Sequence, residues 1–174
     1  MKIGILSDTH MIKECIDKTI PYLKDCDLII HAGDNFSDSK YIHNMTKVGI
    51  MAVKGNCDFD NVEDELIFDI EDKVIFLCHG DKYNVKYGLD EIEAKAKSID
   101  ANIVIFGHTH TPLNFKKDNI IYLNPGSVSL PRGVDYKSFS IMNLENDNIK
   151  IEQIRLQKIV GSFNEEGNEF YRTS

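Results

Sequence analysis

Five apolar runs, each too short to form a helix of its own, punctuate the first 106 residues of the chain. They lie at residues 3–6, 28–30, 48–53, 74–78 and 103–106. Runs of this length are typical of strands buried in a sheet. The chain is therefore expected to be built around buried β-structure.

Between these runs, apolar residues recur at helical spacing. Two series are apparent, Ile12, Ile16, Ile20 and Leu23, and later Leu89, Ile92, Ala96 and Ile99. The first predicts a helix that Pro21 should kink or end early. Residues 37–45 predict a shorter helix with Ser37 as its N-cap. Strands and helices therefore alternate in the first half.

The second half is richer in predicted strands. Residues 66–70 and 74–78 flank the polar turn 71–73 and predict a hairpin. Further strands are expected at residues 119–123, 138–144 and 149–156, with residues 145–148 as the loop joining the last two. Two packed sheets with flanking helices accommodate this pattern, an α/β fold.

Length, charge and the pattern of apolar residues limit the number of domains, the partners and the location expected for the chain. A chain of 174 residues has the length of one domain, expected at residues 1–160, and residues 161–174 form a polar tail that is either an ordered arm or frayed. The formal charge of -8 disfavours broad nucleic-acid binding. No leader or membrane-length apolar run is present, which predicts a cytoplasmic protein whose four cysteines stay thiols.

Side chains able to bind divalent cations follow all five apolar runs. They are Asp8 and His10, then Asp34, Asn56 and His79, and finally His108 and His110. In such sheets, ligands gather in the crevice beyond the carboxyl ends of the strands. Imidazole, carboxylate and amide donors suit Mn²⁺, Fe²⁺, Ni²⁺ or Zn²⁺. The sequence therefore predicts a metal site at this edge.

The pattern resembles the calcineurin-like metallophosphoesterase family, from residue 1 to about residue 132. The motifs that carry the resemblance, in the family's order, are Asp8-Thr9-His10, Gly33-Asp34, Gly55-Asn56, His79 and Gly107-His108-Thr109-His110. The segments 55–58 and 124–128 are most similar to the small bacterial and archaeal phosphodiesterases. The resemblance implies a sandwich of two mixed β-sheets flanked by helices.

The resemblance also implies a dinuclear centre. Asp8, His10 and His110 would hold one metal, Asn56, His79 and His108 the other, and Asp34 would bridge them. Mn²⁺ is the preferred ion, with Ni²⁺, Fe²⁺, Zn²⁺ and Mg²⁺ as alternatives. A phosphodiester would be hydrolysed by in-line attack of a metal-bridging hydroxide, with Asp34 and Asn56 as the catalytic residues. Two cations leave a local charge of about +1 after Asp8, Asp34 and the hydroxide are counted, which attracts a small anionic diester.

One residue departs from the family pattern. Many members have histidine directly after the Gly-Asn pair, proposed to protonate the leaving group, whereas this chain has Cys57. A neutral thiol is a poor acid, so a preference for diesters with good leaving groups is expected. Asn56, Cys57 and Arg132 are the candidate substrate-binding residues, although a surface salt bridge is an equal reading of Arg132.

The sequence leaves other interpretations of the function and of single residues open. The main alternative is a protein-binding scaffold on the same fold that has lost catalysis, and a homo-oligomer is also left open. His31 is a candidate for supporting the metal ligands, whereas Asp81 either contacts a ligand or caps the next segment. Cys78 is read as a buried apolar residue, and residues 116–117 are read as a solvated turn.

Overall fold

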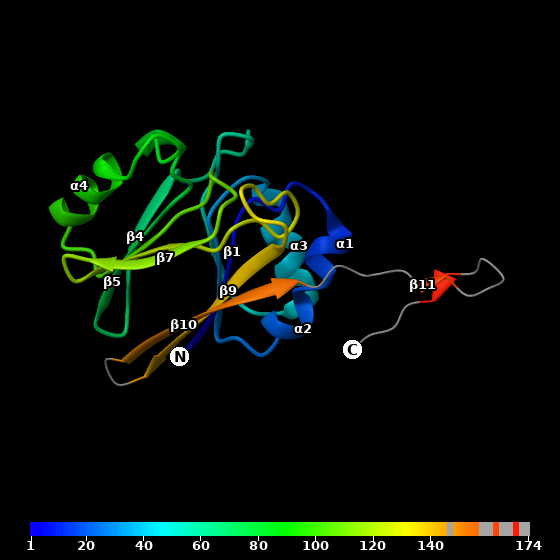
Figure 1. The fold of residues 1–174 in the computed structure, drawn as a ribbon. Coiled ribbons are helices and arrows are strands. Elements are labelled where there is room, and N and C mark those ends of the chain that lie inside the picture. Colours follow the sequence, from blue (N-terminus) through cyan, green and yellow to red (C-terminus); the bar gives the residue numbers. More distant parts are fainter. Residues whose placement is uncertain (146–147, 157–161, 164–168, 171–174) are drawn as a thin grey trace.

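The computed structural model describes residues 1–145 and 148–156, together with the backbone of residues 162–163 and 169–170. Two five-stranded sheets form its centre (Figure 1). The first has the order β10-β9-β1-β2-β3, comprising Asn148–Leu156, Lys137–Glu145, Lys2–Leu6, Leu28–His31 and Ile50–Ala52. The second has the order β4-β5-β6-β8-β7, comprising Glu65–Ile70, Lys73–Cys78, Ile103–Ile105, Ile120–Asn124 and Leu113–Lys117.

Both sheets are mixed. Strands β1, β2 and β3 run parallel, as do β5, β6 and β8. Strands β9, β10, β4 and β7 are antiparallel to their neighbours. Because the carboxyl ends of parallel strands meet at one edge of a sheet, the loops after these strands project from a common edge.

Helices cover the outer face of each sheet (Figure 1). Helices α1 (Lys13–Asp17), α2 (Ile20–Leu23) and α3 (Phe36–Thr46) lie on the first sheet, and α4 (Asp90–Ser98) lies on the second. A 3-10 helix, η1 (Asp81–Tyr83), follows β5. A further pair, β11 (Ser162–Phe163) and β12 (Glu169–Phe170), forms a two-stranded sheet of its own. The predicted α/β sandwich is confirmed.

Buried apolar residues of the described chain form three clusters, one for each interface between layers. Alternation along β5 explains two of them, because successive side chains of a strand point to opposite faces. Ile75 and Leu77 face the other sheet, whereas Phe76 and Cys78 face α4. The third cluster packs Ile16 and Ile42 of the helices against the first sheet. Cys78 is buried, as predicted.

Several local predictions were wrong. The helix expected over residues 12–23 is two short helices, and Pro21 lies at the start of α2, where a missing N–H costs no hydrogen bond. Asn35, not Ser37, is the N-cap of α3, and it makes no side-chain capping bond. Residues 116–117 belong to the edge strand β7 and not to a turn.

Two expectations lie largely outside the described residues. The structure does not describe residues 146–147, which belong to the predicted loop. It also does not describe most of the tail from residue 161. Among the helices that the structure describes, none is long and apolar enough to cross a membrane.

Candidate metal centre

Four of the seven predicted ligands meet in one compact group. Donor atoms of Asp8, His10, Asp34 and His110 all lie within 4.8 Å of one another. His110 Nε2 lies 3.2 Å from Asp8 Oδ1 and 3.2 Å from His10 Nε2. These residues come from the loops after β1, β2 and β6, so the strand ends converge as predicted.

Two further histidines extend this group on its other side. His79 Nε2 lies 3.3 Å from Asp34 Oδ1, and His108 Nδ1 lies 3.1 Å from His79 Nε2. The second oxygen of Asp34, Oδ2, lies 3.8 Å from His10 Nε2. Asp34 therefore stands between two sets of donors and presents one carboxylate oxygen to each.

Asn56, Cys57 and Arg132 lie at the margin. The Asn56 side chain is exposed and donates a hydrogen bond to Cys57 Sγ at 3.4 Å, and no contact recorded among the described residues joins it to the other six predicted ligands. The Cys57 backbone N–H donates to Asp34 Oδ1 at 3.0 Å. The Arg132 side chain is exposed, and its backbone N–H donates to the carbonyl of His110 at 3.2 Å.

The backbone at the predicted ligands is unusual. Five of the seven have a positive φ, namely Asp8 (54°), His10 (48°), Asp34 (59°), His108 (66°) and His110 (60°). Aspartate and histidine tolerate the left-handed region better than most residues, but each still carries a conformational cost. Because such strain persists only where the surroundings impose it and clusters at functional sites, it supports this cluster as the functional site.

Glycines allow the ligand loops to approach one another closely. A Cβ at Gly55 would lie 2.5 Å from the backbone nitrogen of Asp34, and a Cβ at Gly107 would lie 2.8 Å from Asp8 Oδ2. Both approaches are too close for any side chain. The Gly55-Asn56 and Gly107-His108 pairs of the sequence are therefore required by contact between loops.

Backbone carbonyls orient two of the histidines. His110 Nδ1 donates to the carbonyl of Leu130 at 2.6 Å, and His79 Nδ1 donates to the carbonyl of Ala32 at 2.8 Å. In a neutral imidazole a proton on Nδ1 leaves the Nε2 lone pair facing the cluster, which is how proteins orient metal-binding histidines. Burial alone would lower the pKa of His79, but its hydrogen bond to Asp34 and the nearby carboxylates raise it, so in the metal-free fold Nε2 also carries a proton, which a cation would displace.

His31 supports the ligand loops from beneath, as its position in the sequence had suggested. It is fully buried, its Nδ1 accepts from the N–H of Gly33 at 3.3 Å, and its Nε2 contacts Thr9 Oγ1 at 3.0 Å. Thr9 in turn donates to the carbonyl of Asp34 at 3.3 Å.

Asp81 is the first residue of η1 and makes no capping hydrogen bond there. The interpretation of Asp81 as a cap of the next segment is therefore wrong.

A buried segment after β8 holds the ligand loops in place. The hydroxyls of Ser127 and Ser129 both donate to the carbonyl of Asp8, at 2.7 and 2.8 Å. The Asn124 amide donates to the carbonyl of Gly107 at 2.7 Å and to Thr109 Oγ1 at 3.0 Å. The sequence did not predict these roles, although residues 124–128 are among the segments that carry the family resemblance.

The donors of this site have the chemistry of a cation site. Among the buried side-chain nitrogen and oxygen atoms of the described part of the chain, Asp8 Oδ1 alone lacks a hydrogen-bond partner. A buried carboxylate oxygen without a donor is costly unless a cation compensates it. The two carboxylates and their imidazole neighbours fit divalent cations.

Burial keeps one histidine of each donor set neutral, which favours metal binding. Burial, aided by His79 and Lys86, lowers the pKa of His108 to about 4, so its imidazole is neutral at pH 7. Burial also lowers the pKa of His10. Burial alone would raise the pKa of Asp34, but hydrogen bonds from His79 and Cys57 outweigh it and hold the pKa well below the usual range.

The Cys57 thiol stays protonated. Burial, together with the negative charge of Asp34, raises its pKa to about 11. Such a group donates a proton less readily than an ordinary thiol. This agrees with the expectation that Cys57 is a poor general acid.

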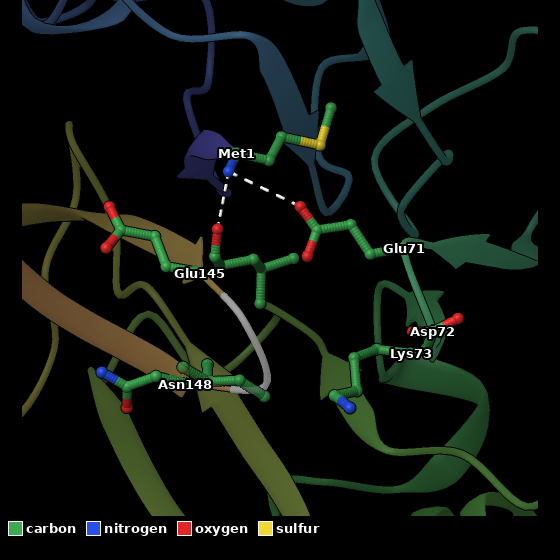
Figure 2. Close-up of a pocket in the computed structure, with 8 residues that line it drawn as sticks. Met1, Glu71, Asp72, Lys73, Glu145 and Asn148 are labelled. Carbon is green, nitrogen blue, oxygen red and sulfur yellow. Dashed lines mark hydrogen bonds and ion pairs between the residues drawn. The ribbon is translucent and has the colours of Figure 1, made fainter.

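A separate cavity lies away from this site. It measures about 660 Å³ and is lined by Met1, the β4–β5 turn and the ends of β9 and β10 (Figure 2). In Figure 2 the amino group of Met1 donates to the carbonyl of Leu144 at 2.6 Å and pairs with Glu71 at 3.6 Å. None of the predicted ligands lines it.

Comparison with known proteins identifies the family. The family model described as the calcineurin-like phosphoesterase superfamily domain matches residues 1–147. The probable metallophosphoesterase YsnB of Bacillus subtilis is 31% identical over 149 residues, which cover 84% of this chain and 86% of that protein. The phosphodiesterase YfcE of Escherichia coli is 28% identical over 138 residues, covering 73% and 70%.

Solved structures agree with this assignment. A protein of Streptococcus pneumoniae described as a predicted phosphoesterase has a TM-score of 0.77 at 25% identity, and the match covers 88% of both chains. An archaeal phosphodiesterase has a TM-score of 0.74 at 26% identity, covering 90% of this chain and all (100%) of that one. Zinc-bound Vps29 of Entamoeba histolytica, at 18% identity, 89% and 99% coverage and a TM-score of 0.71, shares the fold alone. The chain therefore belongs to the calcineurin-like phosphoesterase superfamily, binds divalent metal, and is a metal-dependent phosphoesterase of the phosphodiesterase type.

Proposed function

We propose that the chain hydrolyses a small phosphodiester with two divalent cations, by in-line attack of a hydroxide that bridges them. The observation that carries the proposal is the placement of Asp34. One of its oxygens lies near His79 and the other near His10, so a single carboxylate can serve both cations. A carboxylate shared between two donor sets suits a pair of cations.

Each set of donors would hold one cation. Asp8, His10 and His110 would hold the first, His79, His108 and Asn56 the second, and Asp34 both. For Asn56, the exposed amide has to turn from Cys57 toward His108. When bound, the cations supply positive charge and a nucleophile at neutral pH.

The remaining steps fall to groups of the chain. His108 is neutral at pH 7 and needs no deprotonation before it binds metal. Asn56, exposed beside the cluster, would orient a phosphoryl oxygen. Since the Cys57 thiol keeps its proton, departure of the alcohol depends on its own stability as an anion or on water, which favours diesters with good leaving groups.

Several finer assignments stay predictions. Mn²⁺ is the expected native ion because the donor set mixes imidazole with carboxylate oxygen, and Ni²⁺, Fe²⁺, Zn²⁺ and Mg²⁺ are alternatives. The expected partner is a small diester and not a nucleic-acid surface, in keeping with a net charge of -8. A cytoplasmic location, a domain over residues 1–160 and a homo-oligomer also stay predictions.

The proposal is tested with metal-free protein supplied with Mn²⁺, Ni²⁺, Zn²⁺ or Mg²⁺. Hydrolysis of bis-p-nitrophenyl phosphate should exceed that of the p-nitrophenyl monoester and should vanish in His10→Ala. His43→Ala is the matched control, because His43 is an exposed histidine of α3 that bonds the carbonyl of Val48 at 2.7 Å, outside the cluster. A protein-binding scaffold would hydrolyse neither ester with any ion.

A further inference from the structure

A pocket of about 450 Å³ opens beside the metal centre. Its walls are mainly apolar and include Val85, Leu89, Phe106 and Leu113. Lys86 and Arg132 also line it, and both side chains are exposed. The volume lies within the range of about 300–1,000 Å³ that is usual for small-molecule sites.

The pocket shares its wall with the ligand loops. Thr109, which lines the pocket, stands between the predicted ligands His108 and His110. Val85 packs against Gly80, where an added Cβ would lie 2.9 Å from Val85 Cγ2, and Gly80 directly follows His79. A molecule bound at the cations is therefore adjacent to this pocket.

The charge of the pocket is opposite to that of the protein. The lysines with recorded ion pairs lie outside this pocket. Examples are Lys82, which pairs with Asp64 at 2.6 Å, and Lys97, which pairs with Asp118 at 2.7 Å. Within the described ranges no ion pair is recorded for Lys86 or Arg132, and no acidic residue lines the pocket. Two positively charged side chains without recorded carboxylate partners, next to apolar walls, fit a ligand that is both apolar and anionic.

We propose that this pocket binds one ester substituent of the substrate, a ring-sized apolar group that carries a second anionic group. The apolar part contacts Leu89, Phe106 and Leu113, and the second anion lies between Lys86 and Arg132. This rests on the proposed function, because it places the reacting phosphate at the metal centre. In this proposal Arg132 binds the second anionic group and not the reacting phosphate.

The test compares two symmetric diesters, diphenyl phosphate and bis(4-carboxyphenyl) phosphate, so that either ester position carries the same group. With Mn²⁺-loaded protein, release of each phenol is followed by chromatography. Lys86→Gln and Arg132→Gln should each reduce the preference for the carboxylated diester, expressed as a ratio of kcat/KM, by about fivefold, the size of a weak exposed ion pair. Taking the change in this ratio cancels the different reactivities of the two phenols.

Lys24→Gln is the matched control, since Lys24 is an exposed lysine at the end of α2 with no recorded ion pair among the described residues. It should leave the ratio unchanged. If Arg132→Gln slows both diesters by the same factor, Arg132 serves the reacting phosphate and the proposal is overturned. Leu113→Ser, with Ile67→Ser as control on the opposite edge strand, should weaken binding of both diesters.

A second measurement does not depend on catalysis. In EDTA neither diester is cleaved, and calorimetry should show tighter binding of the carboxylated diester, an advantage lost in Lys86→Gln and kept in Lys24→Gln. Should no metal restore hydrolysis while this binding pattern holds, the proposed function fails and the pocket assignment stands. Equal binding of the two diesters in EDTA would overturn the pocket assignment alone.

Discussion

Ser127 offers a sharp test of how the fold positions a metal ligand. Its fully buried hydroxyl donates to the carbonyl of Asp8 at 2.7 Å and accepts from the N–H of Leu130 at 2.8 Å. In Ser127→Ala the Asp8 carbonyl keeps its bond from the Ser129 hydroxyl, but the backbone N–H groups of Leu130 and Ser129 both lose their acceptor. Two unsatisfied donors at about 2 kcal/mol each cost about 4 kcal/mol, which lowers Tm by about 8–16 °C in a chain of this length.

The same substitution should weaken metal binding. Because outer partners of a site typically contribute about 10- to 100-fold in affinity, the Kd for Mn²⁺ measured by calorimetry should rise by about tenfold. Ser39→Ala is the matched control, since the buried Ser39 hydroxyl donates to the carbonyl of Phe36 at 2.6 Å, within α3. It should lower Tm without changing the Kd. An unchanged Kd in Ser127→Ala would refute the positioning role.

Three further outcomes are expected. Asp34→Ala should abolish hydrolysis of bis-p-nitrophenyl phosphate, and near-normal turnover would contradict its place between the donor sets. Cys57→His should accelerate hydrolysis of a diester with an alkyl leaving group by about tenfold or more, and an unchanged rate would remove the missing-acid explanation. Because His108 has a pKa of about 4 in the metal-free fold and 6.5 when unperturbed, the unfolded chain binds its proton more readily, so stability in EDTA should fall as the pH drops from 6.5 to 4. His108→Asn should flatten that part of a thermal unfolding profile, and an unchanged slope would count against the low pKa.

Local patterns predicted the frame of the molecule. Buried strands such as β1 and β6 are short apolar runs, and the polar residues that follow them mark where each strand ends. Parallel pairing then brings those ends together, which is why the sequence predicted that all seven ligands lie near one another, and the structure brings six of them together. The prediction worked because each of these signals lies within a few residues.

Features that depend on distant contacts were not predictable. Strand β7 has exposed residues at four of its five positions, and only pairing with β8 extends it through residues 116–117. The hydroxyl of Ser127 reaches a carbonyl 119 residues away. The left-handed backbone at Asp8 and His110 is likewise imposed by the surrounding loops, and no pattern of residues predicts it.

The number and place of the bound cations test the account most directly. Crystals of the protein soaked in Mn²⁺ should show two anomalous peaks about 3.5–4 Å apart, with Asp34 between them. Elemental analysis of the same protein should give about two manganese ions per chain. A single ion, or ions bound away from Asp34 and His79, would contradict the dinuclear centre.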